Sequence, residues 1–501
     1  MHQSDVQVVV IGGGPAGLAT AVEAARIVDS VVLVDAGPRL GGQFWRHSAT
    51  DELPGAPAPR WHHGWSTFRE LHDGVREAAA AKKLRALSST HVAAVDRLES
   101  GAFELHLAPT PEADLSAPSV SPLRSIYAQT VVLCPGAYDR QLPVPGWTLP
   151  GVMAAGGVQA FIKTQERSPG ERVLLAGTGP FLLAAAASVI QAGAQVVAIC
   201  ESGDLTGWVP RGVAGVLVPG KGVEGAQYAA LLARHRVPYL RKKVVSRILG
   251  EGQVSSVEIS RADRRGAPVP GTERVLEDID VVGLGWGFVP QSELLVQTGA
   301  ETRLDVDGSL VGVVDAEQES TVPGLFLAGE ITGVTGAVGA VAEGRLAGAA
   351  AAARIIGRSS EMSRWGRSAR ARHRLFAQAM HHAHPAPDGW NDGADESTIV
   401  CRCEEVTLGE ITAARDSLQA EDPRSLKGIT RAGMGMCQGR ICGAAMMCLG
   451  GSGNAPLAAA RGVSKRPLAL PVTVGQLAES DNPTPRCSNA LTPQGSDTAT
   501  P

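Results

Sequence analysis

A glycine-rich loop that joins an apolar run to a small-residue segment is the feature that most constrains the fold of this chain. Residues 8–11 are apolar, and the loop Gly12–Gly17 that follows has the sequence GGGPAG. The order strand, loop, helix is the context in which a G-x-G-x-x-G motif binds a dinucleotide. Gly12 allows a tight turn, Gly14 lets the backbone approach a pyrophosphate, and Gly17 lets the helix pack closely on the strand. We therefore predict a Rossmann-type fold that holds an adenine dinucleotide.

The segments after the first glycine add candidate contacts to the dinucleotide. The predicted helix begins at Pro15, so its free N–H groups and positive dipole end face the phosphates. A second apolar run, 31–34, ends at Asp35, 23 residues after Gly12, where a carboxylate can bond a ribose hydroxyl. The next loop contains a Gly-Gly-Gln sequence of a kind that commonly lies against the cofactor in flavoproteins. The candidate binding residues of this region are Gly12, Gly14, Pro15, Ala16, Gly17, Asp35, Gly42 and Gln43.

A second unit with the same order of elements begins at Arg172. Its predicted strand leads to the loop Gly177–Pro180, and a helix over 181–192 and a strand over 195–199 follow. The third glycine of the motif is replaced by Leu182, which we expect to separate helix and strand. The weaker motif leaves open whether NAD(P) binds here. If it does, Glu201 at the end of the strand favours a free 2′-hydroxyl over a 2′-phosphate.

The two similar starts, 165 residues apart, predict one nucleotide-binding domain inserted into another. We expect the chain to return to the first domain with a strand at 280–284. A further strand then closes over the cofactor within 321–330, and a helix over 340–356 points its N-terminus at it. This pairing of motifs favours FAD over NAD at the first site. Its additional candidate binding residues are Gly136, Gly329 and Glu330.

Four cysteines form two close pairs near the C-terminus, Cys401 with Cys403 and Cys437 with Cys442. In a chain without a secretory signal, such pairs indicate metal ligation rather than disulfides. Zinc would be purely structural. A [2Fe–2S] cluster also takes four cysteines, and it would exchange electrons with a flavin. The sequence favours the cluster, because neither pair has the two-residue gap usual in zinc fingers.

These observations predict an α/β chain of two nested Rossmann-like dinucleotide-binding domains, arranged as in disulfide reductases, with a small α-helical [2Fe–2S] domain at the C-terminal end. The predicted segments are the first part of the FAD domain at 1–168, the NAD-type domain at 169–281, the return to the FAD domain at 282–356, a linker at 357–397, the [2Fe–2S] domain at 398–479 and a disordered tail at 480–501.

Charge and composition narrow the surroundings in which the chain works. The net charge is −4 and no long basic run is present, so nucleic acid is not expected as a partner. The apolar stretch 181–199 is divided by polar residues and glycine, so no membrane span is expected, and we predict a cytoplasmic protein. Three histidines in a loop, His47, His62 and His63, are interpreted as solvated side chains rather than metal ligands.

Two peptides between the nucleotide motifs carry a family resemblance. The peptide GAYDR at 136–140, the run PGWTLPGVM at 145–153 and the C-terminal cysteines resemble one group of flavoprotein subunits. These are the α subunits of the multimeric opine oxidase, proline or hydroxyproline dehydrogenase, and hydrogen cyanide synthase type. The region Cys401–Cys442 is similar to the bacterioferritin-associated ferredoxin-like [2Fe–2S] domain. The resemblance covers roughly residues 5–478, and its most specific part is 136–153.

The resemblance implies an electron-transfer role. The chain would bind FAD and the cluster, while a separate FAD-dependent catalytic β subunit oxidises an amine or amino acid at a CH–NH bond. Such complexes often carry a further flavin at the subunit interface, which would be FMN, and a small ferredoxin-like subunit is a further candidate partner. No catalytic residue is then expected in this chain. Two alternatives stay open: a stand-alone NAD(P)H-dependent reductase that passes electrons to an iron–sulfur acceptor, and a non-enzymatic redox-sensing or iron-delivery scaffold.

Overall fold

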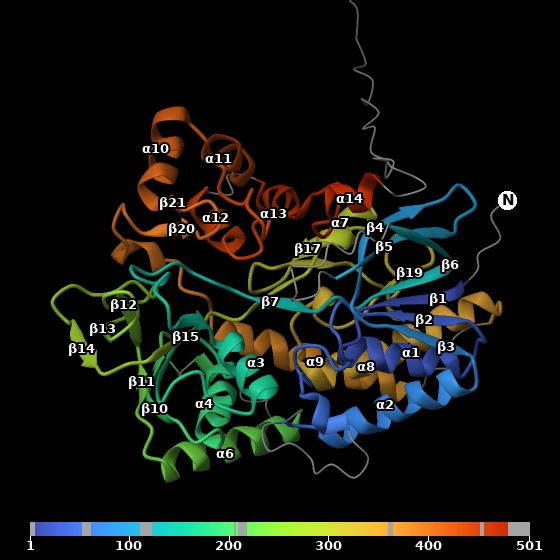
Figure 1. The fold of residues 1–501 in the computed structure, drawn as a ribbon, viewed down its shortest axis with the longest axis horizontal. Coiled ribbons are helices and arrows are strands. Elements are labelled where there is room, and N and C mark those ends of the chain that lie inside the picture. The colour runs from blue at the N-terminus through green and yellow to red at the C-terminus, as the bar shows by residue number, and fades with distance from the viewer. Residues whose placement is uncertain are drawn as a thin grey trace, which may run out of the picture.

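The computed structural model has two sheets side by side and a mostly helical C-terminal lobe (Figure 1). It describes residues 6–52, 62–110, 123–204, 207–208, 218–358, 364–450 and 455–478. The predicted fold class, α/β with nested Rossmann-like folds and a small helical domain, is confirmed by this arrangement. The predicted tail at 480–501 lies outside the described residues.

The first sheet has the order β3-β2-β1-β6-β5-β4, and β19 pairs with β6. Its parallel part starts at the glycine motif, and β4 to β6 form an antiparallel extension. The strands are β1 (Val6–Ile11), β2 (Val31–Val34), β3 (Leu84–Leu87), β4 (Thr90–Arg97), β5 (Phe103–Pro109), β6 (Arg124–Leu133) and β19 (Leu325–Leu327).

Helix α1 (Pro15–Ala25) packs directly on α8 (Ala337–Ile355), and α2 (Trp65–Ala80) lies beside α1. Small residues make the close approach of α1 and α8 possible. A Cβ on Gly344 would lie 2.1 Å from the carbonyl oxygen of Ala16, and one on Gly348 would lie 2.4 Å from that of Thr20. The Ala- and Gly-rich composition of both helices therefore follows from their packing.

The second sheet is entirely parallel, with the order β11-β10-β9-β15-β8. Its elements are β8 (Val152–Ala154), α3 (Ala155–Gln165), β9 (Arg172–Gly177), α4 (Phe181–Gln191), β10 (Gln195–Glu201), α6 (Pro219–Arg234), β11 (Tyr239–Arg241) and β15 (Val281–Gly285). Beside it stands an antiparallel sheet of β12 (Lys243–Leu249), β13 (Ser256–Arg261) and β14 (Arg274–Glu277).

One predicted strand belongs to the other sheet. The strand expected at 280–284 as the return to the first domain is β15, which pairs with β9 in the second sheet, Leu284 beside Ala176. The return is made later, where β19 pairs with β6. The prediction was wrong because a short, continuously apolar parallel strand looks alike in either sheet.

Small antiparallel sheets join the two folds. Strand β7 (Ala137–Asp139) runs from the first fold towards the second and pairs with β16 (Phe288–Pro290), which runs back (Figure 1). After the short helix α7 (Glu293–Gln297), β17 (Thr302–Leu304) and β18 (Leu310–Gly312) form a hairpin. The peptide at 136–140 therefore begins at the crossing between the folds.

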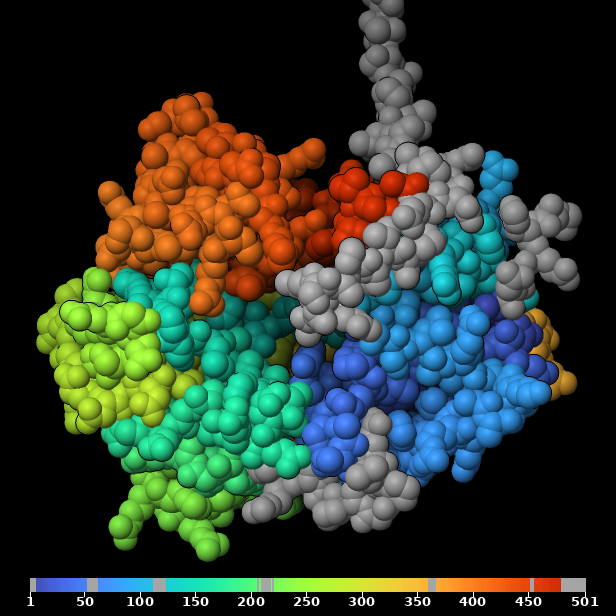
Figure 2. Space-filling view, viewed as in Figure 1, coloured from blue at the N-terminus to red at the C-terminus, as the bar shows by residue number. Residues whose placement is uncertain are grey.

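The C-terminal residues form a lobe above the second fold, and a segment from it extends along the first (Figure 2). Buried side chains of the lobe, such as Val400 and Met446, share one apolar cluster with Leu174 and Leu284 of the second sheet. Helix α9 (Arg364–Ala383) precedes the lobe and packs on α8 (Figure 1). The elements after it are β20 (Ile399–Cys401), β21 (Val406–Thr407), α10 (Leu408–Leu418), α11 (Pro423–Thr430), α12 (Gly443–Leu449), α13 (Pro456–Ser464) and α14 (Val474–Ala478).

The interpretation of the loop histidines as solvated is wrong for two of them. His47 is buried and packs edge-on against Trp65, and the half-buried His62 lies beside the same ring. Burial lowers the pKa of His62 to about 4. The loop is held by aromatic packing that composition alone does not reveal.

Among the described helices, none has the length and apolar character needed to cross a bilayer.

Candidate functional site

The first loop contains two kinds of glycine: Gly12 and Gly17 are required by packing, whereas Gly14 faces open space. Gly12 has φ +102°, and a Cβ on it would lie 2.1 Å from the carbonyl oxygen of Cys134. A Cβ on Gly17 would lie 1.7 Å from the carbonyl oxygen of Gly12. A Cβ on Gly14 would meet only Gly42 Cα, at 3.8 Å. Gly14 is therefore the position at which the loop leaves room for a ligand.

Asp35 lies at the end of β2 and holds the loop. Its carboxylate accepts hydrogen bonds from the backbone N–H groups of Gly13, at 2.5 Å, and Gly37, at 2.7 Å. Burial raises the pKa of Asp35, although both hydrogen bonds and the Arg46 guanidinium oppose the rise. The contact of Asp35 to a ribose hydroxyl stays a prediction.

The structure brings most of the remaining candidates around the loop. Pro15 is the first residue of α1, Ala16 lies under Gly329, and Gly42 lies against Gly14. Gln43 is exposed, and Gly136 has φ +79° at the start of β7 with open space at its Cβ position. Residues from two distant parts of the sequence, Gly42 and Gly329, thus lie against one loop.

Glu330 carries a polar atom that lacks a partner. Its Oε2 is buried and has no hydrogen-bond partner among the described residues, while Oε1 accepts a hydrogen bond from the Gly336 N–H at 3.3 Å. Burial, reinforced by the nearby carboxylate of Glu343, raises the pKa of Glu330 to about 8. A buried unpaired oxygen next to the loop fits the hydroxyl groups of a ribityl or ribose chain, so these residues fit FAD.

Three residues that sequence reasoning missed surround Glu330. Glu343 on α8 accepts hydrogen bonds from the Gly329 N–H, at 3.0 Å, and from Thr332 Oγ1, at 2.6 Å. Arg374 on α9 pairs with Glu343 at 3.1 Å and also donates to the carbonyl oxygen of Thr332. The signal for Glu343 was available, because it is the only acid in the small-residue helix α8. Nothing in the sequence pointed to Arg374.

The second glycine loop is covered by residues of the same chain. Glu201 is fully buried and accepts hydrogen bonds from Thr178 Oγ1, at 2.8 Å, and from the Gly179 N–H, at 2.9 Å. His384, which follows α9, places Nδ1 3.6 Å from Glu201 Oε2, and its Nε2 accepts a hydrogen bond from Trp208 Nε1 at 2.8 Å. Burial would raise the pKa of Glu201, but the contact with His384 and the hydrogen bonds outweigh it and lower this pKa. The acid expected to bind ribose is thus already paired.

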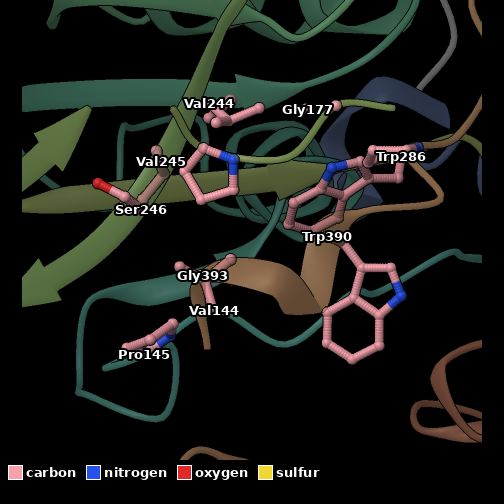
Figure 3. A pocket seen from close by; sticks show the side chains of 13 residues that line it. Val144, Pro145, Gly177, Val244, Val245, Ser246, Trp286, Trp390 and Gly393 are labelled. Carbon is pink, nitrogen blue, oxygen red and sulfur yellow. The ribbon is translucent and has the colours of Figure 1, made fainter. Parts of the chain in front are cut away.

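One cavity at this loop is small. A cavity of about 30 Å³, large enough for only a water molecule or two, lies beside Gly177. Figure 3 shows the side chains around it. Side chains of the second fold, such as Trp286, line it together with Pro387 and Trp390 from the segment after α9. Part of the linker therefore lies at the carboxyl end of β9, the place where a Rossmann fold binds its ligand.

The four cysteines come together as two pairs. Cys401 contacts Cys442, and Cys403 contacts Cys437. The hydrogen bond from Cys442 is the main reason why the pKa of Cys401 falls to about 5, and the Gly433 N–H also donates to this sulfur, at 3.4 Å. Within the described ranges, no three His, Cys, Asp or Glu side chains are arranged to hold a single metal ion. Two thiol pairs fit the two irons of a [2Fe–2S] cluster.

Comparison with known families indicates which cofactor each of the two domains binds. Residues 6–344 match the pyridine nucleotide-disulphide oxidoreductase model, and residues 399–449 match the BFD-like [2Fe-2S] binding domain. The chain belongs to the pyridine nucleotide-disulphide oxidoreductase family. FAD is accordingly the cofactor of the first fold, and the C-terminal lobe carries a [2Fe–2S] domain. The binding residues named above for each group remain predictions.

Relatives in this family match almost the whole chain. Hydrogen cyanide synthase subunit HcnB of Pseudomonas aeruginosa is 30% identical over 447 residues, 87% of this chain and 90% of the relative. An opine oxidase subunit of Agrobacterium tumefaciens is 30% identical over 443 residues, 87% of this chain and 83% of the relative. The solved structure of L-proline dehydrogenase from P. horikoshii is 19% identical, with a TM-score of 0.61, and the match covers 94% of this chain and 79% of that one. The solved structure supports the fold alone.

Proposed function

We propose that this chain is the FAD- and [2Fe–2S]-containing electron-transfer subunit of an amine or amino-acid dehydrogenase complex. Its relatives are named as subunits of hydrogen cyanide synthase and opine oxidase. The substrate is oxidised at a CH–NH bond on a partner subunit that carries its own FAD. FMN at the subunit interface and a small ferredoxin-like subunit complete the proposed assembly. Four cysteines that form no disulfide with one another agree with the reducing cytoplasm.

The observation that carries the proposal is the contrast between the two nucleotide loops. At the first, Glu330 has a buried oxygen free for a ligand. At the second, both oxygens of Glu201 already have partners within the described residues: Thr178, the Gly179 N–H and His384. A flavin that receives no electrons from a nicotinamide nucleotide in its own chain needs another donor. A partner subunit that reduces it meets that need.

The residues of this chain act by binding and positioning. FAD, when bound, takes up and releases electrons singly or in pairs, and a [2Fe–2S] cluster exchanges them one at a time. The Gly12–Gly17 loop and the N-terminus of α1 hold the pyrophosphate, and Glu330 bonds the sugar chain. The cysteine pairs hold the cluster, with backbone N–H groups such as that of Gly433 directed at sulfur. No side chain of this chain is required as a general base.

Anaerobic mixing with NADH separates this role from that of a stand-alone NAD(P)H reductase. We expect the flavin absorbance of the purified holoprotein to persist, because the second loop is covered. Prompt bleaching would overturn the proposal in favour of the reductase. Purification of a tagged chain from its native cells, followed by flavin and iron analysis, tests the partner. The proposal fails if the purified material lacks a second flavoprotein, or if dehydrogenase activity does not depend on one.

A further inference from the structure

A buried arginine lies inside the cysteine loop and contacts the flavoprotein. Arg440 stands between Cys437 and Cys442, and its side chain is 10% exposed. Its Nε donates a hydrogen bond to Tyr138 Oη at 2.8 Å and lies 3.0 Å from Glu293 Oε1. The same guanidinium donates to the Cys437 carbonyl oxygen at 3.2 Å. One side chain thus connects a predicted cluster ligand to β7 and α7.

Arg466 completes this arrangement from the C-terminal side. Its Nη1 lies 2.7 Å from the same Glu293 oxygen, and its Nη2 donates to the carbonyl oxygen of Gln438 in the cysteine loop. Glu293 is 9% exposed and Arg466 is 8% exposed. Two guanidinium groups and one carboxylate are therefore buried together at the seam between lobe and flavoprotein.

Burying such a triad is expensive, and hydrophobic residues of similar volume often give equal stability. The gain lies in geometry, because the planar guanidinium fork fixes several acceptors in one arrangement. Here the acceptors are the main chain of the cysteine loop, the Tyr138 hydroxyl and Glu293. Tyr138 lies two residues after Gly136, a candidate FAD contact. The triad therefore fixes the cluster loop against the segment that leads directly from the flavin fold.

We propose that Arg440, held by Tyr138 and Glu293, is the positioning residue that keeps the cluster at a fixed distance from FAD and thereby sets the rate of electron transfer between them. In each transfer one electron leaves the reduced flavin and enters the cluster, and no bond of the protein forms or breaks. The positive charges of Arg440 and Arg466 also favour the reduced cluster, which carries one more negative charge. The proposal rests on the proposed function only in that the two groups exchange electrons within this chain.

The test compares Tyr138→Phe and Arg440→Lys with the unaltered holoprotein. Tyr127→Phe is the matched control, because the Tyr127 hydroxyl, like that of Tyr138, bonds a charged side chain, here Glu104 at 3.2 Å, but away from the seam. The flavin is reduced anaerobically by a light flash with EDTA as electron donor, and cluster reduction is followed by its absorbance. This assay needs neither substrate nor partner subunit. Failure of the positioning proposal can therefore be told apart from failure of the proposed assembly.

We expect Tyr138→Phe to increase about tenfold the population in which the lobe is detached from the flavoprotein, which is equivalent to about 1.4 kcal/mol. Limited proteolysis between α9 and β20 measures that shift, since cleavage follows the population of the open form. Transfer to the cluster should slow in both seam variants, and Arg440→Lys should have the larger effect. The cluster midpoint potential should stay constant in Tyr138→Phe, which keeps every charge. Unchanged transfer and proteolysis in both seam variants, or equal effects in Tyr127→Phe, would overturn the proposal.

Discussion

At the scale of single residues, the flavin site combines a loop with no room for side chains at two glycines and a Glu330 carboxyl oxygen with no partner among the described residues. Gly12 and Gly17 are fixed by contacts with main-chain oxygens, whereas Gly14 has free space at its Cβ position. Glu330 lies close to Glu343 and keeps one oxygen unpaired. These two features respond to different perturbations, one to volume and the other to pH.

The alanine variants of Gly14 and Gly17 should separate packing from binding. Gly17→Ala places its Cβ 1.7 Å from the Gly12 carbonyl oxygen, so we expect about 1–3 kcal/mol or more of destabilisation together with loss of FAD. Gly14→Ala should fold with nearly unchanged stability but bind FAD more weakly, because its methyl group occupies space for the pyrophosphate. Denaturant unfolding and flavin content measure the two effects. Equal stability losses in both variants would contradict the assignment.

Glu330 predicts a pH dependence of the FAD-free chain. Because its folded pKa of about 8 lies above the ordinary glutamate value of 4.5, the folded state holds a proton that the unfolded state has lost. Stability is therefore fully present below pH 4.5 and is lost as the pH rises towards 8. Glu330→Gln, which stays neutral, should remove this part of the dependence. Thermal unfolding between pH 5 and 8 measures it, and a slope that survives in the variant would rule out Glu330 as its source.

Most residues of the flavin loop were predictable, because their roles depend on local backbone geometry. The motif alone identified Gly12, Gly14 and Gly17, and the structure gives each a distinct steric environment. Arg374 was not predictable, since its contact with Glu343 spans 31 residues and depends on how α9 packs. Long-range side-chain contacts of this type leave no periodic or spaced pattern in a sequence.

At the scale of elements, α9 and the residue after it contact both nucleotide folds, which are separate in the sequence. The region was predicted as a linker, and it contains a helix of 20 residues. Its arginines reach the flavin fold, and its C-terminal end meets the second glycine loop. Strand β15 shows a related limit, because its apolar sequence specified a buried parallel strand but not which sheet it joins.

His384→Ala should expose the second loop. The variant removes the imidazole beside Glu201 and leaves Trp208 Nε1 without its acceptor. We expect a loss of about 1–3 kcal/mol in unfolding free energy, the usual penalty for unpaired buried polar groups. We also expect ADP-ribose binding that the unaltered chain lacks, measured by calorimetry. His382→Ala, at an exposed position near the end of α9, is the control. Binding of equal strength to the unaltered chain would show that the loop is open.

At the scale of the whole molecule, the C-terminal lobe is packed on the second fold, whereas FAD belongs to the first. Cys401 and Cys442 are part of the apolar cluster that includes Leu174 and Leu284 of the second sheet. The division into a flavoprotein and a cysteine-containing domain was predictable from motif spacing. The seam was not, because Tyr138, Glu293 and Arg440 are far apart in sequence.

Removal of one cluster ligand should leave the flavin in place. Cys437→Ser should lose the cluster and stop electron transfer to external acceptors, because an oxygen ligand replaces a thiolate in one of the two pairs. FAD content should stay near that of the unaltered chain, since its loop is in the other fold. Iron analysis, the visible spectrum and flavin extraction measure these outcomes. Joint loss of FAD would show that the two sites depend on each other structurally.

The glycine at the start of the second loop has a consequence for how such chains change over evolutionary time. A Cβ on Gly177 would lie 1.6 Å from the carbonyl oxygen of Gly285, so β9 and β15 could not stay paired if any larger residue were introduced. Selection for a folded sheet alone is then enough to preserve this glycine, whether or not a nucleotide ever binds there. A lineage that has lost the ligand therefore keeps part of the binding motif, and the motif persists after the function that first selected it.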